Sequence, residues 1–287
     1  MSAVERGFPN PPSSQPQWLD LAKKVFNDLS GRWDTSLCNG GLRWQPFNVD
    51  GVGGQYDQKS AIANGLFFQL AARLARHTGD TKYSEWAEKT YDWVTRINLI
   101  GGPNEGHGAK DFNVFDGSQC TDLNCTQVDH DLWSYNAGTY LLGVATMASI
   151  SPSRSPWAAR ALGHLTATQT SFVYKDSGIL WDPNCETQGG TYYPCNTDQA
   201  WFKGYLARWM AQAAQLQPQL KSTVKSILSA SAQAVAKACP GPTDICGMVW
   251  TSGASDGIIG EGHQVSAMSA TIGLLGADVK PPPARGR

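Results

Sequence analysis

Charged side chains are scarce in this chain of 287 residues, where Asp, Glu, Lys and Arg make up 16%, against roughly 25% in an average soluble protein. Neither sign is in excess, because 23 Lys and Arg balance 24 Asp and Glu. The sequence therefore lacks the basic stripe that binds a phosphate backbone and the acidic tail that attracts a cationic partner. We expect no nucleic-acid partner.

Long hydrophobic runs are also missing. No apolar stretch reaches the roughly 18 residues of a membrane span, and no basic and apolar leader follows Met1. Residues 280–287 are rich in Pro and Arg, unlike the hydrophobic signal of a lipid anchor. This chain is expected to contain no transmembrane segment and no signal peptide.

Metal-binding motifs are absent, since no Cys-x-x-Cys and no His-x-x-x-His occurs, and we expect neither a metal nor a cofactor. Six of the seven cysteines form close pairs around loops, which is typical of disulfides made in an oxidising compartment. The glycosylation sequon at Asn124 agrees with secretion, although the chain shows no leader. The spacing predicts the bonds Cys120–Cys125, Cys185–Cys195 and Cys239–Cys246, with Cys38 left free.

Aromatic residues, by contrast, are plentiful: 11 Trp, 9 Tyr and 9 Phe. Pyranose C–H faces pack on aromatic rings, and sugar hydroxyls bind Asn, Gln and Asp side chains, so this composition suits a carbohydrate ligand. The alternative for any single ring is a place in the hydrophobic core.

Helical periodicity dominates the chain. Apolar residues from Ile62 to Leu74 mark one helix face, Gly79 ends that helix, and Asp80 is placed to cap the next one. The pattern predicts eight helices near 16–30, 57–78, 80–98, 130–149, 155–171, 197–215, 218–238 and 260–275, joined by long loops at 34–56, 99–128, 173–196 and 239–258. Strand-like alternation is almost absent.

Short turns that alternate with long loops are typical of a ring of helical hairpins whose long loops gather on the ligand-binding face. Eight helices make four hairpins, so a twelve-helix toroid would be incomplete here, although a smaller helical array is also compatible. We predict a remnant N-terminal segment at 1–15, one helical domain at 16–275 and a disordered tail at 276–287.

Four strings of polar and aromatic residues carry a family resemblance. In this order they are similar to the fungal members of glycoside hydrolase family 76, over roughly residues 8–275. The strings are Gly40-Gly41-Leu42-Arg43-Trp44-Gln45, Ser60-Ala61-Ile62-Ala63-Asn64-Gly65, Trp133-Ser134-Tyr135-Asn136-Ala137-Gly138, and Cys195-Asn196-Thr197-Asp198-Gln199.

The resemblance implies an all-α fold, the (alpha/alpha)6 toroid, and an enzyme that hydrolyses or transfers α-1,6-mannosidic bonds. It implies α-1,6-mannan or a mannosylated glycoprotein as substrate, a monomer, and a secreted or cell-wall or membrane-associated location. The substrate-binding candidates are Gln45, Asn64, Trp133, Tyr135, Asn136, Asp198 and Gln199.

Each string also has a simpler structural explanation. The two glycines before Gln45 could shape a turn over a buried Trp, and Gly65 beside Asn64 could let neighbouring helices approach closely. Asp198 and Gln199 could serve only in the first turn of a helix that Asn196 or Thr197 caps.

Glycoside hydrolysis ordinarily needs two carboxyl groups across the scissile bond. The resembled family carries them as an Asp-Asp-Gln string on an earlier helix, whereas this chain contains no Asp-Asp dipeptide. The resemblance therefore places the catalytic pair upstream of Met1, and we expect a truncated, inactive chain. Asp129 and Asp131 are weak substitutes, because a spacing of two on a helix points side chains to different faces, and Asp198 is a third.

Two other functions stay open at this stage. A non-catalytic mannan- or carbohydrate-binding remnant would explain the missing pair. A lyase or isomerase on an unrelated helical toroid would need a Tyr, His or Arg cluster in the cleft, which the sequence does not single out.

Overall fold

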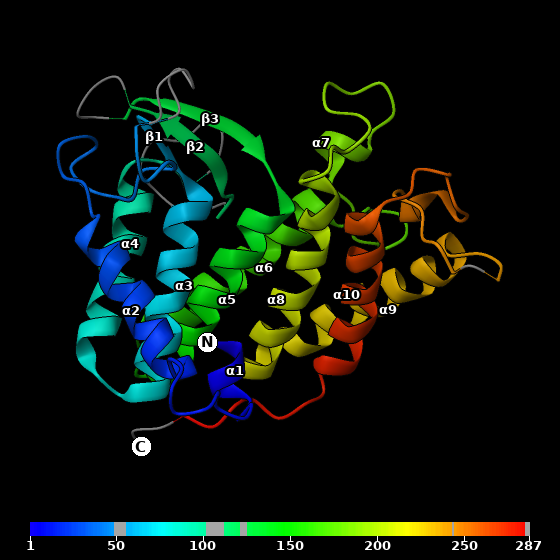
Figure 1. The fold of residues 1–287 in the computed structure, drawn as a ribbon. Coiled ribbons are helices and arrows are strands. Elements are labelled where there is room, and N and C mark those ends of the chain that lie inside the picture. The colour runs from blue at the N-terminus through cyan, green and yellow to red at the C-terminus, as the bar shows by residue number, and fades with distance from the viewer. Residues whose placement is uncertain (49–55, 102–111, 121–124, 243, 285–287) are drawn as a thin grey trace.

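Eight long helices make up most of the structure, a computed structural model that describes residues 1–48, 56–101, 112–120, 125–242 and 244–284 (Figure 1). All eight were predicted, with boundaries that agree to within a few residues at most ends. They are α2 (Trp18–Gly31), α3 (Ala61–Thr78), α4 (Thr81–Arg96), α5 (Ser134–Ile150), α6 (Trp157–Phe172), α8 (Phe202–Leu216), α9 (Lys221–Ala238) and α10 (Glu261–Gly276).

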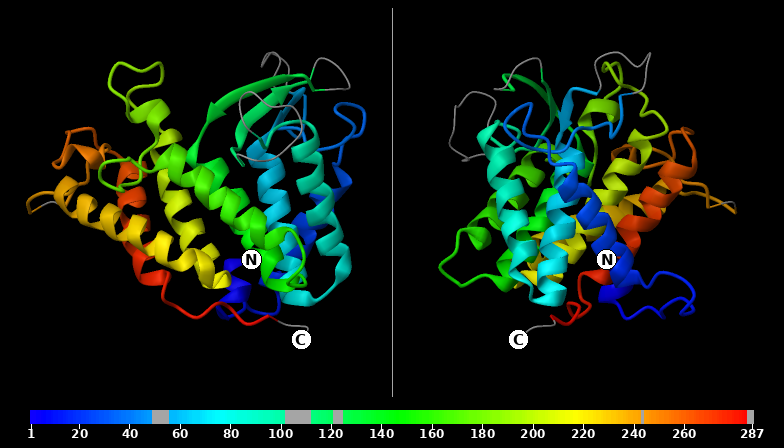
Figure 2. Two further views of the ribbon diagram at one scale, coloured as in Figure 1. Left: turned by 180° about the vertical axis from the view of Figure 1, so that it is seen from behind. Right: turned by 60° about the vertical axis from the view of Figure 1, so that its left-hand side comes forward.

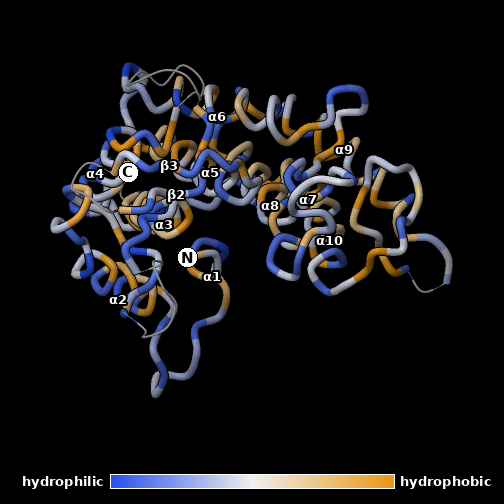
Figure 3. The backbone as a smooth tube through the Cα atoms, turned by 90° about the horizontal axis from the view of Figure 1, so that it is seen from above, coloured by the Kyte–Doolittle hydropathy of each residue, from blue (hydrophilic) through white to orange (hydrophobic). Residues whose placement is uncertain are grey.

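The long helices form two layers. The inner helices α3, α5, α8 and α10 pack side by side along an arc, and α4, α6 and α9 pack outside them (Figures 2 and 3). Each inner helix begins at the upper end in Figure 1, where the long loops lie, and short turns join the helices at the base. The predicted toroid of helical hairpins is confirmed.

The hairpin of α3 and α4 shows how local sequence sets these elements. Ser60 caps α3 by accepting from the amide of Ala63, and Gly79 ends it in the left-handed region at φ 77°. The Asp80 carboxylate then accepts from the Lys82 amide at 3.0 Å and caps α4, as the sequence predicts.

Close helix packing depends on small residues at two crossings. A side chain on Gly138 of α5 would come within 2.9 Å of the Leu206 Cα on α8. A Cβ on Gly65 of α3 would come within 2.7 Å of the Tyr140 ring on α5. Gly65 therefore lets α3 and α5 approach closely, which is the simpler structural explanation that the sequence offered for it.

A small antiparallel sheet, which the sequence did not predict, lies over the upper ends of α3 and α5 (Figure 1). Its strands lie in the order β1–β2–β3, and β3 occupies residues that we expected to be loop and helix. The strands are β1 (Gln58–Ser60), β2 (Phe115–Gln119) and β3 (Gln127–Leu132); short helical turns are α1 (Ser2–Glu5), α7 (Pro183–Glu186), η1 (Gln199–Trp201), η2 (Pro218–Leu220) and η3 (Trp250–Ser252).

Both terminal segments contact the base of the toroid. Arg73 of α3 donates to the Glu5 carboxylate of α1 at 3.0 Å. Arg76 donates to the carbonyl of Pro282 at 2.6 Å. Residues 277–284 therefore run along the protein, where the sequence led us to expect disorder. Among the described helices, none has both the length and the apolar character to cross a membrane.

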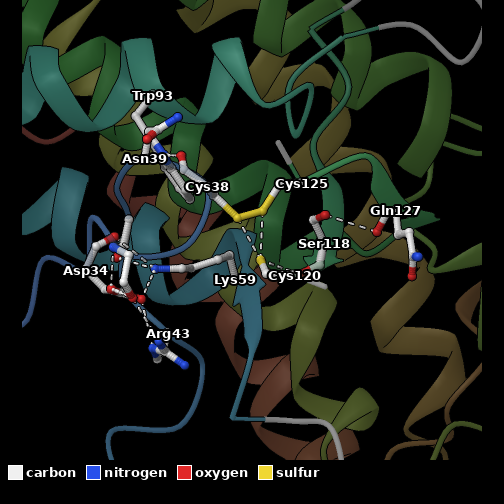
Figure 4. The surroundings of a disulfide bond; sticks show 12 residues. Asp34, Cys38, Asn39, Arg43, Lys59, Trp93, Ser118, Cys120, Cys125 and Gln127 are labelled. Carbon is white, nitrogen blue, oxygen red and sulfur yellow. Dashed lines mark hydrogen bonds and ion pairs between the residues drawn. A yellow bond between two sulfur atoms is a disulfide. The ribbon is translucent and has the colours of Figure 1, made fainter. Parts of the chain in front are cut away.

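Two of the three predicted disulfides are present, Cys185–Cys195 and Cys239–Cys246, with Cα separations of 4.6 and 4.0 Å. The predicted Cys120–Cys125 bond is wrong, because Cys125 is bonded to Cys38 and Cys120 is a buried free thiol. The Cys120 Sγ lies 2.7 Å from the Sγ atom of Cys38 and 2.7 Å from that of Cys125 (Figure 4). Loop spacing missed this pair because the Cys38 loop folds onto the sheet from 87 residues away. Asn124, the sequon residue, lies outside the described residues.

Candidate functional site

A carboxylate on the second strand is the centre of the candidate site. Asp116 accepts a hydrogen bond from the Tyr135 hydroxyl at 3.2 Å and another from the Asn136 amide at 3.0 Å. The pairing of β2 with β3 shifts between Phe115 and Gly117, so Asp116 lies at an irregularity of the kind that redirects a side chain. Two predicted site residues thus hold a carboxylate that the sequence did not single out.

The environment of Asp116 favours its protonated form more than water would. Burial raises the pKa of this carboxyl; the bonds from Asn136 and Tyr135 oppose the rise, and the charges of Asp129 and Asp131 add to it. Asp116 is therefore a partly buried carboxyl that can accept from, and when protonated donate to, a hydroxyl group.

Asp129 and Asp131 lie beside this carboxyl on β3, not on a helix. The charges of both carboxylates act on Asp116, although the irregular pairing of β2 with β3 falls between Asp129 and Leu132. Asp131 accepts from the Tyr192 hydroxyl at 2.6 Å, and this bond raises the pKa of Tyr192 to about 12. Neither carboxylate caps α5, whose first amide donates to Asp182 instead.

Aromatic rings form a wall next to these acids. Trp133, only 6% exposed, meets Tyr192 edge-on at 5.2 Å between ring centroids and Phe202 at 5.6 Å. The Tyr135 ring lies 4.0 Å from Phe202. The wall therefore joins the start of α5 to the start of α8.

A buried carboxylate from a distant loop caps α5. Asp182 accepts from the Ser134 amide at 3.2 Å and from its hydroxyl at 2.6 Å. Burial raises the pKa of Asp182 to about 7, against the opposing bonds from Ser134. Glu186 nearby is paired with Lys203 at 2.9 Å. This network fixes the helix start that carries Tyr135, and no sequence signal pointed to it, because 48 residues separate cap and helix.

A hollow of about 680 Å³ lies beside α3, lined in part by Trp33, Trp44 and Gln45. Trp44 is 43% exposed, so its ring is available for stacking, contrary to the alternative of a buried Trp. Gln45 is half-buried at the same wall. A role of the Gly40–Gln45 string in binding a ligand stays a prediction, for which this hollow offers the space.

Asn64 is fully buried beneath that hollow. Its amide oxygen accepts from the Leu42 amide at 2.7 Å, and its NH2 donates to the carbonyls of Leu42 at 3.1 Å and Ser60 at 2.9 Å. The side chain therefore pins the Trp44 loop to the start of α3.

A buried ion pair holds the same loop from the other side (Figure 4). The Lys59 ammonium donates to the Asp34 carboxylate and to the Gly41 carbonyl, both at 2.9 Å, and Arg43 donates to Asp34 at 2.8 Å. Burial alone would raise the pKa of Asp34, but bonds from Ser36 and Lys59 outweigh it and lower the pKa. Asp34 is therefore a loop anchor that stays ionised.

Asp198 and Gln199 lie just before α8. The Asn196 side chain accepts from both of their amides, at 3.0 and 2.9 Å, and Gln199 accepts in return from the Asn196 amide. This reciprocal cap confirms Asn196 as the helix cap. Asp198 is exposed, whereas the Gln199 side chain is buried and bonded within the cap of its own helix.

The seven predicted residues thus all lie at the end of the toroid where the inner helices begin. The structure groups Tyr135 and Asn136 around Asp116, with Trp133 in the adjoining aromatic wall, places Gln45 at the α3 hollow and Asn64 in the first turn of α3, and sets Asp198 and Gln199 at the α8 start. Within the described residues, the one gathering of metal-ligand side chains is the Cys38, Cys120 and Cys125 cluster, of which two form a disulfide.

Comparison with known proteins agrees with this architecture. The model of glycosyl hydrolase family 76 matches residues 1–285. Mannan endo-1,6-alpha-mannosidase DCW1 of Saccharomyces cerevisiae is 42% identical over 99% of this chain, which spans 59% of that relative's length.

Two solved structures share the fold. Dfg5 from Chaetomium thermophilum, in complex with glucosamine, is 37% identical with a TM-score of 0.85, over 98% of this chain and 67% of that one. An inactive variant of the alpha-1,6-mannanase GH76A of Salegentibacter, with two consecutive aspartates changed to asparagine and bound to alpha-1,6-mannotriose, has a TM-score of 0.71 at 19% identity, over 96% of this chain and 73% of that one. This chain belongs to glycosyl hydrolase family 76.

Proposed function

We propose that this chain binds α-1,6-linked mannan on the face where the inner helices begin, as part of a mannan endo-1,6-α-mannosidase or transglycosylase. The observation that carries the proposal is the oriented, partly buried Asp116 carboxyl beside an aromatic wall. Carboxylates that accept from sugar hydroxyls, next to rings that pack on C–H faces, are what a pyranose requires.

Asp116 binds a mannose hydroxyl pair in this proposal, and Trp133 and Tyr192 bound the same subsite. The Tyr192 hydroxyl and Asp131 form a second polar edge at 2.6 Å from each other. The Trp44 and Gln45 hollow takes sugar residues further along the polymer. Asn64 and Gln199 position loops and helices instead of touching the ligand, and Asp198 lies outside the central subsite.

We further propose that this chain binds mannan but does not turn it over. Hydrolysis needs an acid and a second carboxylate across the scissile bond, roughly 5 to 10 Å apart. The Salegentibacter variant with two consecutive aspartates replaced is called inactive, and this chain has no consecutive pair. Should the chain prove active, Asp116 with Asp129 or Asp131 offers the nearest substitute.

The same relatives support the remaining parts of the proposal. Because the yeast relative is a mannan enzyme, we place the function at the fungal cell wall, secreted or membrane-associated, with mannan or a mannosylated glycoprotein as substrate. The chain acts as a monomer. A non-catalytic carbohydrate-binding protein is the second candidate, favoured by the missing aspartate pair.

Calorimetric titration with α-1,6-mannotriose tests the binding site. Asp116→Asn should weaken binding about tenfold or more, because a bond to a charged group is lost, and Trp133→Ala should cost about 1–3 kcal/mol. Asp80→Asn is the matched control, since Asn caps α4 equally well at the opposite end of the molecule. Equal affinities for wild type and Asp116→Asn would refute the assignment.

Turnover of α-1,6-mannooligosaccharides tests the proposed inactivity of this chain. Binding with product formation at the uncatalysed rate supports a binding chain. If the wild-type chain turned over the substrate at an enzymatic rate and Asp116→Asn abolished that activity, the proposed inactivity would be wrong. The catalytic groups would then lie within this chain.

A further inference from the structure

A small hollow lies at the base of the toroid, at the opposite end of the molecule from the sheet that carries Asp116 (Figure 1). Its walls come from α1, from the inner helices α3, α5 and α8, and from the C-terminal segment. Its volume is about 80 Å³, against roughly 30 Å³ for one water in the liquid, so it has room for a compact polyatomic ion but not for a sugar ring. The lining that matters here is Glu5, Arg6, Arg73, Arg76, Gln212 and Gln215.

Three guanidinium groups and one carboxylate belong to this lining. Arg73 is paired with Glu5, with 2.5 Å between Nη2 and Oε2. Arg6 donates instead to the side-chain oxygen of Gln215 at 2.6 Å, a neutral partner. Over the part of the chain that the structure describes, neither Arg6 nor Arg76 forms an ion pair. The hollow therefore carries two positive charges that no described acid balances.

Arg76 is the member of the lining that most needs an opposite charge. The residue is only 8% exposed, and its guanidinium donates to the Ser149 hydroxyl at 3.2 Å and to the Pro282 carbonyl at 2.6 Å. A buried charge costs free energy unless an opposite charge pairs with it, and neutral oxygens offset only part of that cost. Burial lowers the pKa of Arg76, and the charge of Glu5 opposes this only in part. An anion in the hollow would complete the pairing.

Donors remain for such an anion. Each guanidinium has five N–H groups, whereas the hydrogen bonds to described residues number two for Arg6 and three for Arg76. The half-buried Gln212 side chain lines the same hollow and makes no hydrogen bond to another described residue. Guanidinium N–H groups and an amide NH2 are the donors that hold the oxygens of a phosphate or sulfate.

We propose that this hollow binds one free tetrahedral oxyanion, phosphate or sulfate, which accepts hydrogen bonds from Arg6, Arg76 and Gln212. The donors come from the residue after α1, from α3 and from α8, so they can reach different oxygens of one tetrahedral ion. Its double negative charge matches the two unbalanced guanidinium groups.

The ion also links the two terminal segments to the base of the toroid. Arg6 donates to the Lys280 carbonyl at 3.4 Å, and Arg76 donates to the Pro282 carbonyl at 2.6 Å. Both arginines therefore connect the bound ion to the C-terminal segment. This role does not depend on mannan binding at the other end of the molecule.

Calorimetric titration with inorganic phosphate tests the site, with chloride exchanged so that the ionic strength stays constant. Wild type should bind one phosphate per chain. Arg76→Gln and Arg6→Gln should each weaken the affinity about tenfold or more, because each removes a hydrogen bond between two charged groups. Sulfate should compete with phosphate. Mannose 6-phosphate should bind far more weakly, because its sugar ring does not fit the hollow.

Arg32→Gln is the matched control. Arg32 is an arginine of the molecular surface that pairs with Asp28 on α2 and does not line the hollow, so this variant should keep the wild-type affinity for phosphate. Should Arg76→Gln fail to fold, Arg6→Gln decides the question, because Arg6 is exposed and its replacement should leave the fold intact.

Thermal unfolding supplies a second readout. Phosphate should raise the midpoints of wild type and Arg32→Gln more than those of the two other variants, because an ion that binds only the folded state stabilises it. Stabilisation through exclusion of the salt from the protein surface would instead raise all midpoints equally.

Equal midpoint shifts, a phosphate affinity that Arg6→Gln leaves unchanged, or mannose 6-phosphate binding as tight as that of phosphate would each overturn this inference. None of these outcomes would affect the proposed function, which mannotriose binding tests separately.

Discussion

Replacing Asn64 by alanine removes three buried hydrogen bonds at once and leaves the peptide group of Leu42, a residue only 4% exposed, without its partners. An unsatisfied buried polar group costs about 1–3 kcal/mol, and the Leu42 amide and carbonyl are two such groups. Alanine returns about 0.5 kcal/mol through its higher helix propensity. The free energy of unfolding should therefore fall by about 2–5 kcal/mol.

Urea unfolding followed by circular dichroism measures this loss. The control is Asn27→Ala, an exposed Asn on α2, which should stay within about 0.5 kcal/mol of wild type. If Asn64→Ala were as stable as wild type but bound mannotriose poorly, Asn64 would contact the sugar, as the sequence led us to expect. That result would refute its role as a loop anchor.

Two further outcomes follow from buried groups. The pKa of Asp182 is about 7 in the folded protein, against 3.8 for an ordinary Asp side chain, so the carboxyl binds its proton more tightly when the protein is folded. The stability that this proton contributes below pH 4 should therefore be lost as the pH rises to about 7. Asp182→Asn should flatten this fall in urea midpoints between pH 4 and 7, and an unchanged slope would contradict the assignment. Non-reducing peptide mapping should find Cys38 linked to Cys125, with Cys120 alkylated only after unfolding; a Cys120–Cys125 peptide would show the opposite pairing.

The helices could be predicted because their signals are local. The apolar spacing from Ile62 to Leu74, the Gly79 stop and the Asp80 cap each act within one or two turns, and the structure places them as predicted. Asn196 likewise caps residues that follow it directly. The toroid then follows from packing short hairpins side by side.

The sheet and the centre of the site could not be predicted in this way. Asp116 lies in a segment of five residues with no clear alternation, and it acquires its role only because β3 and α5 place Asp129, Tyr135 and Asn136 around it. Residues 130–132 of β3 were expected to begin a helix, so the strand that carries Asp129 and Asp131 was missed. The Asp182 cap and the Cys38–Cys125 disulfide could not be predicted from the sequence for the same reason, since each joins segments far apart in the chain.

A crystal structure of this chain with α-1,6-mannotriose would show directly whether Asp116 binds the sugar. We expect a mannose with a hydroxyl within hydrogen-bond distance of the Asp116 carboxylate and a ring face against Trp133 or Tyr192. Density for the sugar elsewhere, with Asp116 bonded only to Tyr135 and Asn136, would contradict it.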